Sequence, residues 1–286
     1  MKNYILAILA LLIYPAFLFS QEKVKDSVPD KPERAAFESS FIIDNPTDIV
    51  FTKKTFEFTI NHRFGTFNGG TNDLIGFWAP SNIRIGLAYA PHDRITVGFG
   101  TTKFDRLQDF NWKVGLLRQT RSGKIPVNIS YYGNFVIDAR KKENFALDQH
   151  RYSFFNQLIF SRRFTPGFSL QIAPSVSHFN VVDANMQNDR WAIALGGRAK
   201  ISPQSAIIWD YSQPITQFDI NPDLNNYGNK PGVSIGIEIR TSSHAFQIFF
   251  SNYNGIVPQQ SYVKNENDFF DGDILIGFNI TRLYNF

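Results

Sequence analysis

The sequence contains no cysteine, so no disulfide bond holds the fold together. After Phe19, no stretch approaches the run of about eighteen apolar residues that a membrane-spanning helix needs, which excludes a helical membrane protein. Long blocks of like charge are also missing, and the net charge is only +4, so we expect no nucleic-acid partner. Stability must therefore come from a large core or from a sheet that closes on itself.

The N-terminus has the form of an export signal. Met1-Lys2-Asn3 precedes an apolar run from Tyr4 to Phe19, and Ser20 supplies a small residue for cleavage. We expect residues 1–20 to be a signal peptide that is removed during export through the inner membrane. No cysteine follows the run, so we expect no lipid anchor.

From Thr55 onward, apolar residues recur at every second position, which is typical of β-strands with one apolar face. Phenylalanine is abundant at these positions and in the whole chain, with 29 residues that require an apolar phase. We count about twelve such segments and no amphipathic helix. They cover residues 56–64, 83–89, 95–99, 110–116, 127–137, 152–160, 168–176, 191–195, 207–211, 233–239, 246–250 and 274–280.

The connections between these segments alternate between long and short. This pattern predicts short periplasmic turns at one rim and long external loops at the other, and an even strand number places both termini in the periplasm. The sequence thus predicts an all-β fold for residues 54–286: a closed antiparallel transmembrane β-barrel in the outer membrane, in contact with its lipid bilayer. Residues 21–53 begin polar and charged and contain several prolines, so we expect them to form a mobile periplasmic leader. Its apolar patch Phe41-Ile42-Ile43 would plug the barrel, pair at a sheet edge or belong to a loosely packed tail.

Turn lengths support this strand register, because paired residues in an antiparallel ladder share a face. The apolar positions on both sides of Pro91-His92-Asp93 are odd, so a three-residue turn fits there and would turn Arg84 and Arg94 inward on neighbouring strands. The apolar parity changes between residues 239 and 246, which predicts a two-residue turn at Ser242-Ser243.

The second face of the strands distinguishes a membrane barrel from a soluble β-sandwich. A sandwich would expose many Lys and Glu residues on that face. Here it is rich in Gly, Ala, Ser, Thr, Asn and Gln, which indicates a crowded polar lumen.

The C-terminal strand resembles the assembly signal of outer-membrane barrels. Phe286 ends the chain, and Tyr284, Ile280 and Phe278 precede it on the same face. The resemblance implies recognition by the barrel-assembly machinery. Arg282 departs from the pattern, because an apolar residue is usual there, although near the rim its charge can reach water.

Three segments carry a resemblance to a known family: Phe56–Gly65, Ile83–Tyr89 and Lys113–Gln119. They are similar to an uncharacterised outer-membrane β-barrel family, a domain of unknown function of Gram-negative bacteria and of the Bacteroidota type. The resemblance covers most of the mature chain. It implies the fold and the location and supplies no catalytic residue.

Charged residues with lumen parity are the candidate functional residues. A basic excess there predicts either a constriction that favours anions or internal ion pairs that fill a narrow barrel. We therefore expect a narrow channel for a small, possibly anionic solute, or a non-conducting scaffold that binds another envelope protein. The residues are Glu57, Arg63, Arg84, Arg94, Lys113, Arg198, Asp210, Glu238 and Arg240, with Asp138, Arg151 and Lys200 by the same parity.

The sequence contains little that suggests catalysis. Its five histidines share no metal-ligand spacing, so we expect neither a metal nor another cofactor. A lipid-modifying enzyme could use Ser177 and His178, but adjacent residues in a strand point to opposite faces. We expect no enzyme. In the long loops, Phe77 and Trp78 are expected to pack into the mouth of the barrel or to bind a partner.

Overall fold

The computed structural model describes residues 30–182, 188–216 and 229–286. The predicted signal peptide, residues 1–20, lies outside this range, as does the start of the leader. Within the described residues, no helix is long and apolar enough to cross a membrane.

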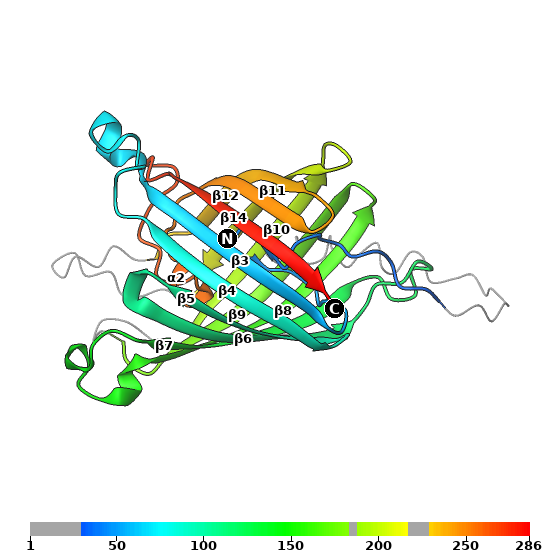
Figure 1. The fold of residues 1–286 in the computed structure, drawn as a ribbon, viewed down its shortest axis with the longest axis horizontal. Helices are drawn as coiled ribbons and strands as arrows, with labels where there is room; N and C mark the ends of the chain where they lie inside the picture. Colours follow the sequence, from blue (N-terminus) through cyan, green and yellow to red (C-terminus); the bar gives the residue numbers. More distant parts are fainter. Residues whose placement is uncertain (1–29, 183–187, 217–228) are drawn as a thin grey trace.

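Twelve antiparallel strands form a closed barrel, as predicted (Figure 1). Each strand pairs with its neighbours in the chain, and the barrel closes where the last strand, β14, pairs with the first, β3. The strands are β3 (Thr55–Thr66), β4 (Asn82–His92), β5 (Ile95–Thr102), β6 (Leu107–Leu117), β7 (Asn128–Asp138), β8 (Tyr152–Thr165), β9 (Phe168–Phe179), β10 (Arg190–Lys200), β11 (Ser205–Pro214), β12 (Gly232–Arg240), β13 (His244–Ser251) and β14 (Leu275–Asn285).

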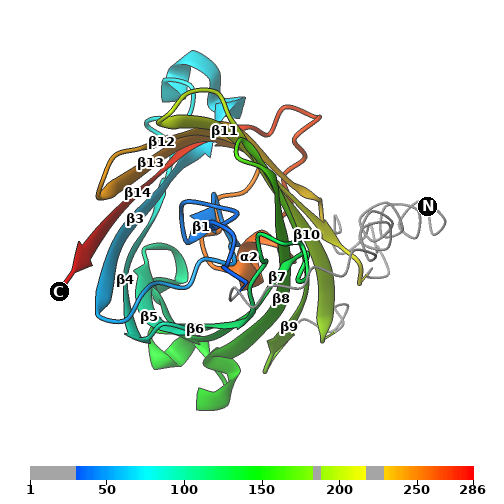
Figure 2. The ribbon, with the colours of Figure 1, turned by 90° about the vertical axis from the view of Figure 1, so that its right-hand side faces the viewer.

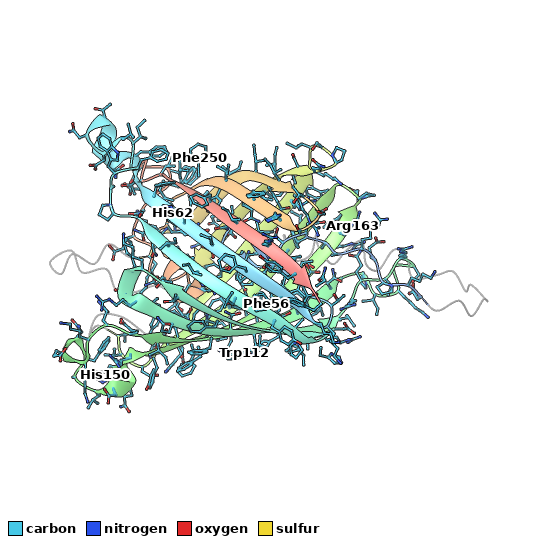
Figure 3. The ribbon with its side chains drawn as sticks, viewed as in Figure 1. Phe56, His62, Trp112, His150, Arg163 and Phe250 are labelled. Carbon is cyan, nitrogen blue, oxygen red and sulfur yellow. The ribbon has the colours of Figure 1, made fainter. Side chains whose placement is uncertain are left out.

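Apolar side chains point outward and form the surface that faces lipid. Phe56, His62, Trp112 and Phe250 are examples (Figure 3). Neighbouring strands place their rings side by side, with centroids 5.2 Å apart between Phe99 and Phe110 and 5.1 Å apart between Phe135 and Phe154. Such cross-strand aromatic pairs stabilise the register. Their rings recur at every second residue of a strand, which is the pattern that predicted the strands.

Short turns lie at the end of the barrel where β3 begins and β14 ends. The connections 166–167, 201–204 and 241–243 are short, whereas the longest connections lie at the other end. Among the described residues, the connections at this end contain the short helices η1 (Phe67–Asp73), η2 (Phe104–Arg106), η3 (Lys142–Asn144) with η4 (Asp148–Arg151), and α2 (Pro258–Ser261). Ser242-Ser243 forms the predicted two-residue turn, since Arg240 pairs with Ala245 and the Thr241 amide donates to the His244 carbonyl.

The turn between β4 and β5 differs from the prediction. Tyr89 pairs with Val97, but His92 pairs with Ile95, so a bulge absorbs one residue and the turn consists of Asp93 and Arg94. An odd number of residues between the paired apolar positions is needed to keep them on one face of the sheet. The bulge supplies the odd residue, and no three-residue turn is formed. Arg94 consequently lies exposed at the short-turn rim.

The first long loop folds outward, so the expected packing of Phe77 and Trp78 into the mouth is wrong. The Phe77 ring lies 4.5 Å from the ring of Phe64, and Phe64 contacts His62 and Phe278 on the lipid side. Trp78 is 71% exposed. The loop therefore leaves the mouth free for another part of the chain.

Candidate functional site

The lumen is filled by the segment that precedes the barrel. Residues 36–49, here called the plug, enter from the short-turn end and form a hairpin of β1 (Phe41–Ile42) and β2 (Asn45–Pro46) inside the ring of strands (Figure 2). The patch Phe41-Ile42-Ile43 thus lies in the lumen, and Ile42 and Ile43 are buried. The prediction of a periplasmic leader is corrected for the plug, which buries its apolar side chains inside the barrel.

The plug is fixed at both of its ends. Before it, the Glu33 amide donates to the Gln119 carbonyl at 2.8 Å, and Pro32 pairs with Thr120 in the connection between β6 and β7. After it, the Lys54 amide donates to the Ala90 carbonyl at 2.8 Å, next to the start of β3. The chain therefore enters and leaves the lumen at the same rim.

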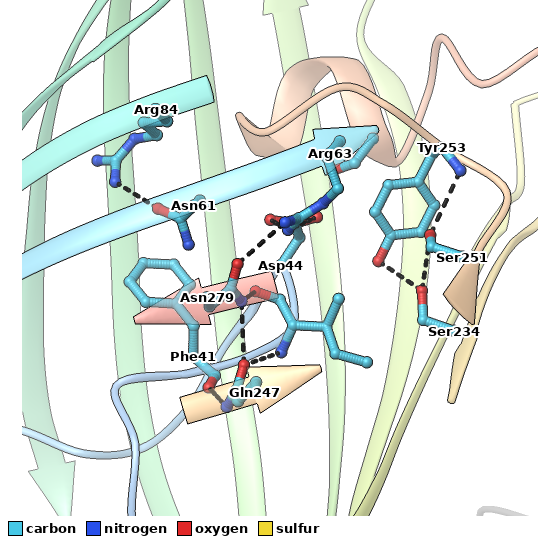
Figure 4. A network of polar contacts seen from close by, with 12 residues as sticks. Phe41, Asp44, Asn61, Arg63, Arg84, Ser234, Gln247, Ser251, Tyr253 and Asn279 are labelled. Carbon is cyan, nitrogen blue, oxygen red and sulfur yellow. Dashed lines mark hydrogen bonds and ion pairs between the residues drawn. The ribbon is translucent and has the colours of Figure 1, made fainter. Parts of the chain in front are cut away.

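At the tip of the hairpin, the backbone of Ile43 bonds to Gln247 and Asn279 of the barrel wall, and Figure 4 shows these two wall residues beside Asp44. The Ile43 amide donates to Oε1 of Gln247 at 3.1 Å, and the Ile43 carbonyl accepts from Nδ2 of Asn279 at 2.8 Å. Ile43 has a φ of 57°, a left-handed conformation that is unfavourable for a β-branched residue. The two wall amides hold this turn in place.

Wall carboxylates bond to the same hairpin. The Ser39 hydroxyl donates to Glu238 at 2.6 Å, and the Ser40 hydroxyl donates to Glu57 at 2.7 Å. Lys113 donates to the Ser40 carbonyl at 2.9 Å. Charged groups of the lumen thus recognise ordinary polar groups of the plug.

Two acidic residues of the leader neutralise basic residues of the wall. Asp44 accepts two hydrogen bonds from Nη2 of Arg63, at 2.7 and 2.8 Å, and both side chains are buried. Glu38 lies 3.4 Å from Arg198 and 3.3 Å from Arg240. The basic excess inferred from lumen parity is therefore compensated by the plug.

Other ion pairs lie within the wall itself. Arg84 donates to both oxygens of Asp109, at 2.7 and 2.9 Å, and Arg198 donates to Glu238 at 2.8 Å. The sequence reading missed Asp109, although its parity places it opposite the lipid-facing Phe110. It also missed Glu38 and Asp44, which lie in a segment without periodicity.

A long loop closes the lumen from the external end. Residues 252–274, here called the external loop, connect β13 to β14 and contain α2. Tyr253, Val257 and Tyr262 are buried, and the Gln259 amide donates to Asn134 of β7 at 2.6 Å. Figure 2 shows α2 inside the ring together with β1.

Asp210 of β11 is the point where the plug and the external loop meet. One carboxylate oxygen accepts from Nδ2 of Asn45 in the plug at 3.1 Å, and the other accepts from the Tyr253 hydroxyl at 3.1 Å. Burial raises the pKa of Tyr253 well above its ordinary value, so this hydroxyl remains a donor. The two segments are thus joined through one side chain.

Little space remains between the plug and the wall. A cavity beside Phe41, Asp44 and Arg84 has a volume of about 10 Å³, as has one beside Glu38 and Arg240. Each volume corresponds to roughly one water molecule. The plug therefore packs closely against the described wall at both places.

Asp48, at the end of the plug, is a titratable group whose ionisation responds to burial. Loss of hydration raises the pKa of its carboxyl to about 6, against the opposing effects of a Ser161 hydrogen bond and the Lys113 charge. Its ionisation therefore opposes docking of the plug.

The predicted lumen charges lie as follows. Eight of the nine principal candidates face the interior or its short-turn rim: Glu57, Arg63, Arg84, Lys113, Arg198, Asp210 and Glu238 are buried, and Arg240 lies beside Glu38. The prediction that Arg94 faces the lumen is wrong, because the bulge in β4 places Arg94 in the exposed turn between β4 and β5. Asp138, Arg151 and Lys200 lie near the rims, with Asp138 paired to Arg140 at 2.6 Å and Lys200 exposed.

Ser177 and His178 point to opposite faces of β9. Ser177 is buried, whereas His178 is exposed and lies 2.8 Å from Asp189. Within the described residues, no group of three His, Asp or Glu side chains could hold a metal ion.

Comparison with known proteins agrees with this architecture. A family model described as "Membrane bound beta barrel domain (DUF5777)" matches residues 37–284, which include the plug. No curated protein matches the sequence. Among solved structures, the chain is similar to the NanC porin, with 5% identity, a TM-score of 0.50 and coverage of 81% of this chain and 99% of that chain.

Two further structures have lower scores. The KdgM porin is 6% identical, with a TM-score of 0.45 and coverage of 81% of this chain and 99% of that chain. An outer membrane channel from Pseudomonas putida F1 is 9% identical, with a TM-score of 0.45 and coverage of 82% and 97%. At such identities, the likeness concerns the fold alone.

Proposed function

Since the chain belongs to the DUF5777 family of membrane-bound beta barrel domains and lies in the outer membrane, we propose that it is a narrow channel closed by its own N-terminal plug. When the plug leaves the lumen and the external loop, which is joined to it through Asp210, also moves aside, a small and preferentially anionic solute passes. The observation that carries this proposal is the charge compensation between the plug and the wall.

Without Glu38 and Asp44, the wall has more basic than acidic side chains. A low-dielectric passage with a basic excess raises the local concentration of anions. The described wall residues that bear on this balance are Arg63, Arg84, Lys113, Arg190, Arg198 and Arg240 against Glu57, Asp109, Asp210 and Glu238.

The plug is also attached in a way that suits a gate. Its contacts to the wall are individual hydrogen bonds, ion pairs and apolar contacts to Ile208 and Phe249, and it does not join a strand of the barrel. Its removal leaves all barrel ladders intact.

A reversible lock tests this channel directly. A Cβ atom added at Gly196 would lie 3.3 Å from Nδ2 of Asn45, so Asn45→Cys with Gly196→Cys can link the plug to the wall in a chain that has no other cysteine. We expect no conductance in planar bilayers while the pair is oxidised, and anion-selective conductance after reduction. Each single-cysteine variant serves as a control that cannot lock. Equal conductance in the oxidised and reduced states would contradict closure by the plug.

Charge variants test the selectivity. Arg63→Glu with Arg198→Glu should shift the preference of the reduced, unlocked barrel from chloride toward potassium, because both side chains face the lumen. Arg94→Glu is the matched control, since Arg94 lies exposed in a turn. A shift of similar size in the control would assign the selectivity to surface charge.

A non-conducting scaffold is the second candidate, and the filling of the lumen from both ends favours it. In that case, the loops or the leader bind another envelope protein, and the internal ion pairs serve stability. Well-reconstituted barrels without conductance, both as wild type and with Asp44→Asn, would select the scaffold.

A further inference from the structure

A hollow of about 430 Å³ opens at the external end of the barrel. Its walls come from the external loop, the loop between β5 and β6, and the ends of β10 and of the connection before β12. The volume lies within the range of small-molecule sites, about 300 to 1,000 Å³.

Five of the twelve residues that line the hollow carry side-chain amides. Asn229, Asn254, Gln260, Asn265 and Asn267 all reach it. An amide group offers a donor and an acceptor in one plane, which suits a ligand that carries both kinds of group.

Two of these amides have a buried atom without a hydrogen-bond partner among the described residues: Nδ2 of Asn229 and Oε1 of Gln260. One is a donor and the other an acceptor. Leaving such groups without a partner is unfavourable. Both residues line the hollow, so a rotation of either amide toward it would let a ligand hydroxyl satisfy the buried atom, because a hydroxyl donates and accepts.

The amide wall is held in place before any ligand arrives. Nδ2 of Asn265 donates to the Pro231 carbonyl at 3.3 Å and to the Asn267 carbonyl at 3.2 Å, and the Lys230 amide donates to the Asn265 carbonyl at 2.7 Å. Lys230 also donates to Asp268 at 3.0 Å, and this hydrogen bond raises the pKa of Lys230. It joins the connection before β12 to the external loop a second time. The site is therefore preformed.

The remaining lining is aromatic and balanced in charge. Phe104 and Tyr253 contribute rings, whereas Arg190 and Lys264 are matched by Asp105 and Glu266. Charge balance gives no reason for the site to select a strongly charged ligand.

We propose that this hollow binds a small saccharide, whose hydroxyl groups pair with Asn229 and Gln260 and whose C–H face lies against the aromatic rings. This inference goes beyond the proposed channel and does not require that the barrel conducts.

The test is calorimetric titration of the full chain in detergent with maltose as the probe. Asn229→Asp replaces the unpartnered donor by an acceptor with almost the same shape, and Gln260→Met removes the acceptor together with the Nε2 donor that bonds to Asp105 at 3.0 Å. We expect binding to weaken about tenfold in each variant, as for the loss of one well-made hydrogen bond. Asn144→Asp, in an exposed position of another external loop, is the matched control and should bind as the wild type does.

Recognition by amides predicts an affinity that changes little between about 0.1 and 1 M salt. Absence of binding by the wild type, equal affinity in all variants, or a steep salt dependence would each overturn the saccharide site. Faster migration of unheated samples on a denaturing gel verifies that every variant forms a barrel. The titration measures no conductance, so absence of saccharide binding would not contradict the proposed channel.

Discussion

Replacement of Asp44 by Asn should release the plug. The substitution keeps the shape of the side chain and removes its charge, so Arg63 loses its ionic partner while it remains fully buried. Arg63 would retain the His62 carbonyl at 2.8 Å, Oδ1 of Asn279 at 3.0 Å and the Phe249 ring at 4.4 Å, and all three are uncharged.

Removal of one partner from a buried ion pair costs about 3–5 kcal/mol. This cost applies to the docked state, because water reaches Arg63 once the plug has left. Each 1.4 kcal/mol is a factor of ten in an equilibrium. We therefore expect the released population to rise at least about a hundredfold.

Thiol labelling measures this population. Ala36→Cys introduces a single thiol into a chain without cysteine, at a position that is only 4% exposed when the plug is docked. The rate of reaction with a water-soluble maleimide reports how often the plug opens. With Asp44→Asn, this rate should rise in proportion to the released population.

Two variants control the experiment. Asp148→Asn removes an exposed pair with Lys142 and should leave the rate unchanged. Adding Arg63→Gln to Asp44→Asn removes the unpaired charge and should restore slow labelling in part. An unchanged rate in Asp44→Asn barrels that migrate normally on gels would refute the role assigned to this pair.

Three further expectations follow from the same contacts. Because burial raises the pKa of Asp48 to about 6, from about 3.9 in a solvated chain, its contribution to docking is complete below about pH 4 and is lost as the pH rises through 6. The labelling rate of Ala36→Cys, divided at each pH by the rate of a fully exposed cysteine because the thiolate is the reacting species, should thus be lower near pH 5 than near pH 8, and Asp48→Asn should flatten this ratio. Tyr253→Phe leaves Asp210 without one donor, so protease in intact cells should cut the external loop faster; an unchanged cleavage rate would argue against this bond. Deletion of Phe286 should lower insertion into the outer membrane without affecting export, and a normal yield there would remove its role in assembly.

The barrel was predictable because lipid imposes a strict pattern. Most lipid-facing positions must be apolar, so a two-residue period identifies each strand, and the Ser242-Ser243 turn follows from parity alone. Arg94 was misplaced because parity fixes only whether a spacing is odd or even. A bulge before His92 and a longer turn satisfy the same condition.

The two-residue period could not decide whether the segment before the barrel plugs the lumen, pairs at a sheet edge or forms a loosely packed tail. The plug is held by the backbone of Ile43 and by single acidic residues such as Asp44, and neither leaves a periodic signal. Parity assigned the basic residues to the lumen but did not identify their partners. The same parity could have identified Asp109 as a lumen residue, because Asp109 is next to the lipid-facing Phe110 in β6.

The position of the plug tip bears on how the barrel is assembled. Ile43 and Asp44 bond to Gln247 on β13, Asn279 on β14 and Arg63 on β3, which are the strands on both sides of the seam. Joining β14 to β3 brings together the two ends of the domain and is its longest-range pairing, a step that is slow in folding. The plug precedes β3 in the chain and presents hydrogen-bonding groups where the last strands must arrive. We therefore expect the plug to act as an internal template for closing the cylinder, so a weakened plug should delay assembly even where the finished barrel is stable.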